Sequence, residues 1–488
     1  MSLADDLVRL GVPNYVASEL GASLATGKYT GLVASRCRMP NTSGGANNYS
    51  NSRSRHVAMD SVQTVQLVYT NKVATSAGGV ETNPGFTTTI KAGIEWPVGT
   101  ITPVTWSGQS SITLANGDIQ VSDPVTLPTA FVIGHVFYVK TYQVSGGTGL
   151  VWHQYIGVNN VTGAVPNSGE WYTASASLIA DHSWDTTNSN NSILSTIYYP
   201  AAIIGTTARR TVALCGDSRA WGYGEAQQNI SNDYGAVGDI ERGLSRQFAT
   251  VNLAIGGDAF VTAISGSNYN VRKQIASYCN TIVSEYGIND FVAGNTAAAT
   301  IANLYTFAAL LGNKPFYQCT VAPKAASTDA YQTTTNQTTD ATANGPRVTF
   351  NNAVRAGLAY PVAGYIELAD NYESARDSGL WKAPLRSATD LNITTGTTAV
   401  TSTAQMQFTQ ADVGTGLVIA GAGAAGAVLS TFILAVTSPT ACTVATAAGT
   451  TVTNAAGGLV YTRDGLHATS GANRQLEFSP RFSNVVSY

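Results

Sequence analysis

Charged residues are scarce in this chain of 488 residues. They make up 11% of the sequence, against roughly 25% in an average soluble protein. Lys and Arg total 26 and Asp and Glu total 29, which leaves a net charge of −3. A protein that binds nucleic acid through the phosphates needs a basic surface, so this balance argues against a nucleic-acid partner. Hydrophobic residues still make up 44% of the chain, which excludes a disordered protein and allows a large core.

Cysteine and histidine are also rare, with five residues of each. The cysteines are widely scattered without a Cys-x-x-Cys pair, and the histidines lack the spacing of metal ligands. Neither a zinc site nor a disulfide framework is indicated, and we expect no metal and no other cofactor. Each thiol is expected to be buried and reduced. The cysteines are Cys37, Cys215, Cys279, Cys319 and Cys442.

The N-terminus lacks the features of a targeting signal. No basic stretch is followed by an apolar one, so the sequence predicts no secretory signal peptide. Ser2 and Asp5 instead resemble a helix-capping pair, and leucines follow at helical spacing. We therefore expect residues 1–34 to form a helical N-terminal segment.

Residues 35–205 have the alternating polar and apolar pattern of β-strands. Asn116-Gly117 lies between two such runs and predicts a hairpin, because a type I′ turn needs two positive φ angles. The run 132–142 is apolar on both faces and is expected at the centre of a sheet. Many short strands separated by turns predict an all-β sandwich that resembles a jelly roll.

Five of the seven tryptophans lie in this β module. Aromatic side chains on a β-sandwich can stack on sugar rings, whereas the usual role of a tryptophan is to fill the core. Most of the five are expected in the core, and sugar binding stays open for the others. They are Trp96, Trp106, Trp152, Trp171 and Trp184.

From about residue 209 the pattern changes to strands that alternate with helices. Helices are predicted at 296–311 and 347–357, and this alternation predicts a parallel sheet with helices on both faces. The pattern breaks at about residue 388, and we interpret residues 389–460 as a small β-rich insertion. The predicted strands of the α/β region are 211–215, 251–255, 281–285, 316–321 and 364–368.

Four short polar blocks follow elements of this α/β region. Gly216-Asp217-Ser218 comes after its first strand, Gly256-Gly257-Asp258 after the second, and Gly287-Ile288-Asn289-Asp290 after the third. The carboxyl ends of parallel strands meet at one edge of a sheet, where open α/β sheets bind their ligands. The fourth block, Asp464-x-x-His467, lies near the C-terminus, and an Asp at this spacing can orient the imidazole.

In this order the blocks resemble those of the SGNH (GDSL-type) hydrolase family, whose fold is a three-layer α/β/α domain. The resemblance implies that Ser218 is the nucleophile, His467 its general base and Asp464 the residue that orients the histidine. It also implies an oxyanion hole made by the backbone N–H groups of Ser218 and Gly257 and by the side-chain amide of Asn289. The resemblance covers residues 209–388 and 461–488, which would form one hydrolase domain.

Two departures from the family pattern are visible. Arg219 follows the serine where the family has an aliphatic residue, which predicts a cation near the mouth of the site. The long interval between Ser218 and His467 is explained by the insertion.

Residues 416–436 carry no charge and are long enough to cross a bilayer. A span there would separate the nucleophile from its base, so we expect no membrane span.

The family hydrolyses esters. The helical start of the chain, its Gly/Thr-rich insertion and its very low charge together resemble phage tail proteins. The sequence therefore predicts a polysaccharide O-acetylesterase in a virion tail or outside the cell. Its partner would be an acetylated polysaccharide, and it would be a homo-oligomer, a trimer in the case of a tailspike. Two alternatives stay open: a general carboxylesterase or lipase, and a receptor-binding structural protein whose hydrolase fold is a relic.

Overall fold

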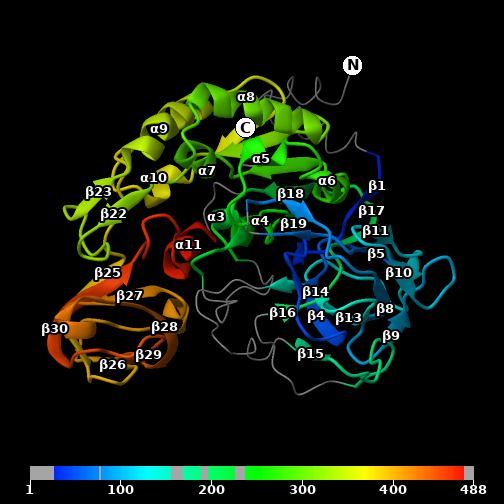
Figure 1. Cartoon of the computed structure of the whole chain (residues 1–488), viewed down its shortest axis with the longest axis horizontal. Coiled ribbons are helices and arrows are strands. Elements are labelled where there is room, and N and C mark those ends of the chain that lie inside the picture. The colour runs from blue at the N-terminus through cyan, green and yellow to red at the C-terminus, as the bar shows by residue number, and fades with distance from the viewer. Residues whose placement is uncertain (1–26, 76–77, 155–168, 188–195, 226–236, 478–488) are drawn as a thin grey trace, which may run out of the picture.

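The computed structural model describes residues 27–75, 78–154, 169–187, 196–225 and 237–477 (Figure 1). An α/β region lies at the top of the view, a β-rich region at the lower right and a separate barrel at the lower left.

The α/β region is built on a six-stranded parallel sheet with the order β2-β19-β18-β20-β21-β24. Every residue of the four inner strands is buried, so both faces of the sheet are covered. All five strands predicted in this region are present, with ends displaced by a few residues. The two predicted helices correspond to α8 (Ala297–Leu310) and α9 (Ala341–Ala356). The strands are β2 (Cys37–Arg38), β18 (Thr211–Cys215), β19 (Ala249–Asn252), β20 (Thr281–Ser284), β21 (Phe316–Cys319) and β24 (Val362–Ile366).

The prediction of a helical segment over residues 1–34 is wrong in its last part. Tyr29–Leu32 forms strand β1, which pairs antiparallel with β17 (Ala202–Thr207). Four backbone pairs and a buried Leu32 outweigh the local helical pattern. Residues 1–26 lie outside the described residues.

The boundary predicted between the β module 35–205 and the α/β region is also wrong. Strand β2 (Cys37–Arg38) pairs parallel with β19 and forms the edge of the parallel sheet. Cys37 is fully buried there, and all five cysteines are buried and free, as expected. One hydrophobic core continues from the β region into the α/β region, so the two are packed as one body.

The two largest antiparallel sheets of the β region have the orders β1-β17-β5-β11, with β12 also paired to β5, and β10-β8-β13-β4-β15, with β9 also paired to β8. Two smaller sheets, β16-β14-β3 and β6-β7, accompany them. A hydrogen bond of 2.6 Å between the hydroxyls of Tyr69 and Thr141 joins the two largest sheets across their core. Strand β13 contains most of the apolar run 132–142 and lies at the centre of its sheet, as predicted. The further strands are β3 (Thr42–Gly44), β4 (Tyr49–Val57), β5 (Thr64–Thr70), β6 (Val73–Ala74), β7 (Glu81–Thr82), β8 (Thr88–Glu95), β9 (Ile101–Pro103), β10 (Ile112–Leu114), β11 (Ile119–Val121), β12 (Val125–Thr126), β13 (Val136–Ser145), β14 (Leu150–Gln154), β15 (Trp171–Ser175) and β16 (Thr196–Ile197).

The hairpin predicted at Asn116-Gly117 does not form. Strand β10 before it pairs with β8, and strand β11 after it pairs with β5, so the chain crosses from one sheet to the other. Gly117 does adopt a positive φ of 88°, and its N–H donates to the carbonyl of Asn71 at 2.8 Å. The dipeptide thus predicted a turn correctly. The strands before and after the turn, however, pair with strands that are distant in the sequence and not with each other.

None of the five tryptophans of the β region is exposed. Trp106 and Trp171 are buried, and the other three are half-buried. Trp184 also donates its Nε1–H to the carbonyl of Ala92 at 2.7 Å. These side chains therefore belong to the packing of the β region and do not form an exposed stacking surface.

The predicted β-rich insertion is a closed six-stranded barrel with the order β25-β26-β29-β28-β27-β30. It has its own hydrophobic core, and its first and last strands pair, with Arg386 opposite Leu459. Residues 416–436 run through two of its strands. Among the described residues, no helix has the length and apolar character that a membrane span requires. The strands are β25 (Arg386–Ile393), β26 (Ala399–Ser402), β27 (Gly416–Ile419), β28 (Leu429–Ser438), β29 (Ala441–Val444) and β30 (Val452–Val460).

Candidate active site

Ser218 lies at the carboxyl end of β18, an inner strand of the parallel sheet, and begins the short helix α3 (Ser218–Trp221). Asp217 caps this helix, since its Oδ1 accepts a hydrogen bond of 3.0 Å from the backbone N–H of Arg219. Gly216 allows the sharp turn between strand β18 and this helix. A Cβ on Gly216 would lie only 2.8 Å from the Cβ of Ala220. The turn leaves Ser218 half-buried at the sheet edge.

The structure brings the three predicted triad residues into one hydrogen-bonded chain. His467 Nε2 lies 2.8 Å from Ser218 Oγ, and His467 Nδ1 lies 2.6 Å from Asp464 Oδ2. Asp464 Oδ1 also accepts hydrogen bonds from the backbone N–H groups of Leu466 and His467, at 2.9 and 2.8 Å. Burial alone would raise the pKa of Asp464, but the hydrogen bond and charge of His467 hold that pKa well below its usual range. The carboxylate is therefore ionised at neutral pH.

The loop that carries Asp464 and His467 depends on Gly465, which has a φ of 73°. Its carbonyl accepts hydrogen bonds from the backbone N–H of Ala325 at 3.0 Å and from Trp381 Nε1 at 2.9 Å. A Cβ at this glycine would lie 1.8 Å from the carbonyl oxygen of Ala325. No other residue type fits this position without moving the loop.

Arg219 is not a cation at the mouth of the site, so that prediction is wrong. Its side chain is buried, and its guanidinium donates three hydrogen bonds of 2.9 Å to backbone carbonyls. The acceptors are Leu466, Ala322 and Pro323. Arg219 therefore ties the helix that begins with the serine to the peptide directly before His467. The sequence offered one signal for this role, an arginine at a position where an aliphatic residue was expected.

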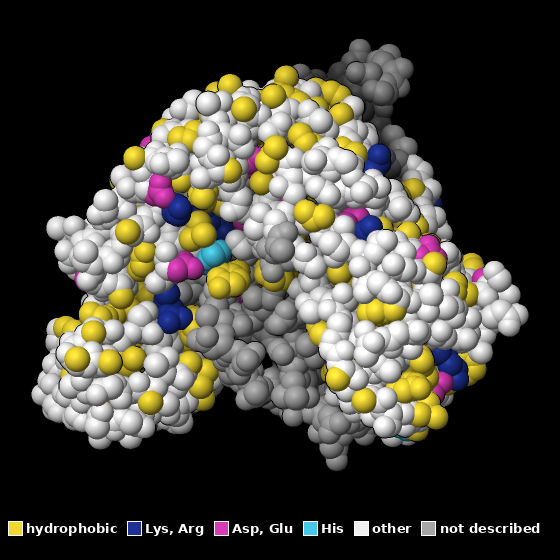
Figure 2. Space-filling model, in the orientation of Figure 1, with side chains coloured by type: hydrophobic (Ala, Val, Ile, Leu, Met, Phe, Trp, Pro, Cys, Tyr) yellow, Lys and Arg dark blue, Asp and Glu magenta, His cyan; other side chains and the backbone are white. Residues whose placement is uncertain are grey.

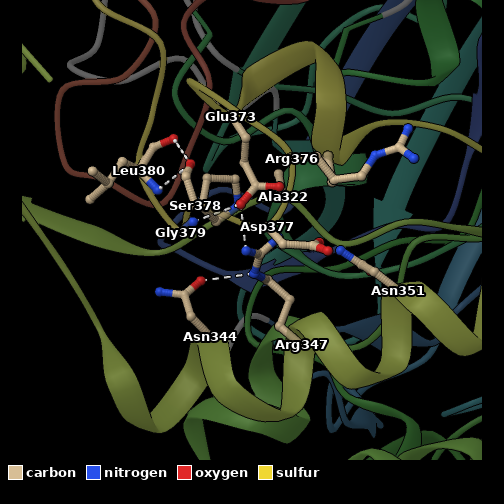
Figure 3. A network of polar contacts seen from close by, with 12 residues as sticks. Ala322, Asn344, Arg347, Asn351, Glu373, Arg376, Asp377, Ser378, Gly379 and Leu380 are labelled. Carbon is tan, nitrogen blue, oxygen red and sulfur yellow. Dashed lines mark hydrogen bonds and ion pairs between the residues drawn. The ribbon is translucent and has the colours of Figure 1, made fainter.

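A second buried arginine supports the loop that accepts two of these hydrogen bonds (Figure 3). Arg347 of α9 donates its Nη1–H to the carbonyl of Val321 at 3.0 Å and pairs through Nη2 with Glu373 at 2.5 Å. Asn351 of the same helix donates to the same carbonyl at 3.0 Å and accepts from the N–H of Val321 at 2.8 Å. The loop after β21 is thereby fixed to α9.

Gly257 and Asn289 follow the two strands that flank β18. Asn289 Nδ2 donates to the carbonyl of Asp258 at 2.8 Å, so the amide contacts the residue that follows Gly257. The N–H of Ile255 donates to the carbonyl of Gly216 at 3.1 Å, which binds this segment to the turn that carries the serine. Gly257 is exposed and has a φ of 77°. Asn289 is thus linked to the segment that carries Gly257, and this segment is hydrogen-bonded to the turn before Ser218, while the oxyanion hole itself stays a prediction.

Three carboxyl groups, those of Asp217, Asp239 and Glu285, are buried close together in the α/β region. Burial raises the pKa of Asp217 to about 7, and burial together with the neighbouring carboxyls raises the pKa of Glu285 well above its usual value. Sequence patterns did not reveal this cluster. Within the described ranges, no group of three or more His, Cys, Asp or Glu side chains is arranged to hold a metal ion.

A cavity of about 220 Å³ lies beside His467. The ring of Tyr223, 40% exposed, forms one wall with its centre 4.4 Å from that of His467. Figure 2 shows a histidine at the surface between the α/β region and the barrel, next to acidic and basic side chains. The barrel contributes Phe432 of β28, which nothing in the sequence marked as a site residue. The lining residues are Tyr223, Gly224, Phe432, Arg463, Asp464, His467 and Thr469.

No protein-family model and no curated protein sequence matches this chain. Solved structures with which it shares similarity include a lipase/acylhydrolase from Enterococcus faecalis, 19% identical over 36% of this chain and 89% of that one, with a TM-score of 0.25. A psychrotrophic esterase from Pseudoalteromonas is 15% identical over 33% and 78%, with a TM-score of 0.22. A family two carbohydrate esterase from Cellvibrio japonicus is 10% identical over 70% and 89%, with a TM-score of 0.21. The function proposed below therefore rests on the residues of the site.

Proposed function

We propose that this chain is a serine esterase of the SGNH (GDSL-type) hydrolase family. The observation that carries the proposal is the hydrogen-bonded chain from Ser218 Oγ through His467 to Asp464, at the carboxyl edge of a parallel sheet. The sheet is covered on both faces, which supports a three-layer α/β/α domain. Gly257 and Asn289, the remaining family motifs, follow the strands beside the serine.

In the proposed reaction, Ser218 Oγ attacks the carbonyl carbon of the ester while its proton passes to His467 Nε2. Asp464 accepts a hydrogen bond from Nδ1 and stabilises the imidazolium. The oxyanion accepts hydrogen bonds from the backbone N–H groups of Ser218 and Gly257 and from the side-chain amide of Asn289. Each donor of this kind stabilises the transition state by about 3–4 kcal/mol. The alcohol leaves with the proton from His467. Water then attacks the acyl-enzyme by the same steps and releases the acid.

We further propose that the acyl group is acetyl and that the alcohol is a sugar of a polysaccharide. The cavity beside His467 has a volume of about 220 Å³, below the roughly 300–1,000 Å³ of pockets that hold drug-sized ligands, which suits a small group. Phe432 places the barrel at the edge of this cavity, so a polymer can contact the barrel while its ester is cleaved. Because the tryptophans of the β region are not exposed, we assign polymer contacts to the barrel and to Tyr223.

A place in a phage tail or outside the cell is part of the proposal. The low charge of the chain and its content of Gly, Thr and Ala support it, since these are common in tail proteins. A tailspike would be a trimer, and sedimentation velocity measures this directly. A monomer at micromolar concentration would contradict the tailspike assignment.

Release of free acetate from an O-acetylated polysaccharide tests the enzymatic proposal. Wild type should release acetate and Ser218→Ala should not, whereas Ser177→Ala, at an exposed serine of the β region, should behave as wild type. Faster cleavage of long-chain esters than of acetyl esters would indicate a general carboxylesterase. Failure to cleave any ester would favour a receptor-binding structural protein.

A further inference from the structure

Two charged side chains line the cavity beside His467, those of Arg463 and Asp464. They are neighbours in sequence but bind different parts of the molecule. The carboxylate of Asp464 is held by His467. The guanidinium of Arg463 lies against the barrel, and its Cζ is 3.7 Å from the ring centre of Phe432.

Contacts with the barrel fix the orientation of this side chain. Nε donates to Ser430 Oγ at 3.2 Å, and Nη2 donates to the carbonyl of Ser430 at 3.0 Å. The aliphatic stem crosses Gly416 of β27, where a Cβ would lie 2.9 Å from Arg463 Cγ. The ring of Phe432 covers one face of the guanidinium and stabilises its charge.

The charge of Arg463 has no counter-ion in the described part of the chain. Two other arginines of the α/β region are neutralised by carboxylates: Arg272 pairs with Asp258 at 2.7 Å, and Arg347 pairs with Glu373. The buried Arg219 has no carboxylate partner in the described residues, but its guanidinium donates three hydrogen bonds to backbone carbonyls. Among the residues that the structure describes, no carboxylate lies within ion-pair distance of Arg463. Burial lowers the pKa of this arginine, although the nearby carboxylate of Asp464 opposes that shift.

One end of the Arg463 guanidinium is available to a ligand. Its Nη1 has no hydrogen-bond partner among the described residues. This atom is also not fully buried. The group is therefore accessible at the cavity. A fixed, accessible and unneutralised guanidinium beside the proposed general base is suited to bind an anionic group of the substrate.

We propose that Arg463 binds a carboxylate or phosphate on the sugar that carries the acetyl ester. This inference rests on the proposed esterase function and makes it more specific, because it names the substrate as an acidic glycan. Since Asp464 is held toward His467, the anion approaches from the barrel side of the cavity. Arg463 is thus a specificity-determining residue that the insertion holds in place.

Three acetylated methyl galactosides that differ only at C6 test this inference. C6 is the carbon of a hydroxymethyl group in the first, the carbon of a carboxylate in the second, and the carbon that bears a phosphate ester in the third. Rates of acetate release give kcat/KM for each. Wild type should prefer at least one anionic sugar over the neutral one by about 10- to 100-fold, the usual effect of a charge-assisted hydrogen bond. The anionic sugar with the higher kcat/KM relative to the neutral sugar shows whether carboxylate or phosphate is the natural group.

Arg463→Gln should bring the ratio of anionic to neutral kcat/KM close to one, mainly through a higher KM for the anionic sugar. Arg463→Lys should keep part of the ratio, because it retains the charge but loses the guanidinium geometry. The control is Arg386→Gln, a barrel arginine that pairs with Asp412 at 2.5 Å and does not line the cavity. It should keep the wild-type ratio. Thermal unfolding of each variant checks that the barrel is intact.

An absence of anion preference in wild type, with the neutral sugar still cleaved, would overturn the role of Arg463 and leave the esterase proposal standing. The same holds if Arg463→Gln keeps the preference. If wild type cleaves neither the neutral sugar nor 4-nitrophenyl acetate, the esterase proposal itself fails. The wild-type preference should also fall in 0.5 M salt, because ions screen a pair that is open to solvent.

Discussion

An Arg219→Met variant should lose both stability and turnover, because one guanidinium joins the two parts of the proposed active site. Methionine keeps much of the length of the stem and removes only the donors. The substitution leaves the carbonyls of Leu466, Ala322 and Pro323 without their buried partner. The Ser218 helix and the His467 loop would then be free to move apart.

The magnitude follows from the three hydrogen bonds of 2.9 Å. A hydrogen bond from a charged donor contributes about 1.5–3 kcal/mol. Single substitutions rarely cost more than about 4–5 kcal/mol, so we expect the free energy of unfolding to fall by about 3–5 kcal/mol. Misplacing a catalytic group by about 1 Å costs roughly 100-fold in rate. We therefore expect kcat to fall about 100-fold, with a small change in KM.

Urea unfolding followed by circular dichroism measures the first effect, and hydrolysis of 4-nitrophenyl acetate measures the second. Arg376→Met is the matched control, since Arg376 pairs with Asp370 at the surface and its side chain is 61% exposed. An exposed pair of this kind contributes about 0–1 kcal/mol. If Arg219→Met resembles this control in both assays, Arg219 does not position the site as argued here.

Four further predictions follow from the site and the insertion. Ser218→Ala should lower kcat on 4-nitrophenyl acetate by about 10⁴-fold or more, and substantial residual turnover would remove the proposed mechanism. Gly465→Ala should lower both the melting temperature and kcat, because its Cβ would clash with a backbone carbonyl at 1.8 Å; a wild-type melting curve would contradict this. Burial raises the pKa of Glu285, so the native state keeps a proton that the unfolded chain loses above about pH 4, and stability falls as pH rises. Glu285→Gln should therefore gain stability over wild type at pH 8 but not at pH 4 in urea titrations, and an equal difference at both would refute the shift. Replacing 390–460 with a Gly/Ser linker should leave a folded protein, since the barrel has its own core, but one in which Arg463 loses its barrel contacts and the preference for anionic sugars is lost.

The sequence was most informative where local and tertiary preferences agree. The four inner strands of the parallel sheet are buried on both faces, so they form short and mainly apolar runs such as Thr211–Cys215. The polar residues that follow such runs lie at one sheet edge for purely geometric reasons. That is why Ser218, Gly257 and Asn289 could be located before the structure was known. His467 and Asp464 were recognisable because both their spacing and their order along the chain matched a family pattern.

Features that depend on distant partners were not predictable in the same way. Strand β2 (Cys37–Arg38) has only two residues and shows no periodicity, so only its pairing with β19 defines it. Arg219 was expected to be a cation near the mouth of the site, but the three carbonyls that bind it come from two separate loops that are distant in the sequence. Asn116-Gly117 marks a turn equally well in a hairpin and in a crossover between sheets.

The β region and the barrel are joined to the α/β region in physically different ways. The barrel keeps its own core, and its first and last strands pair, so both chain ends leave it side by side next to the Asp464–His467 loop. The β region shares the main core and supplies the edge strand β2. It also supplies Glu81, a buried carboxylate that accepts hydrogen bonds from the backbone N–H groups of Val271 and Arg272, at 2.9 and 2.8 Å. Residues 209–488 alone would leave those groups without their acceptor and expose the edge of β19. The barrel is therefore the part that can vary with the substrate, while the β region is part of the scaffold that holds the serine in place.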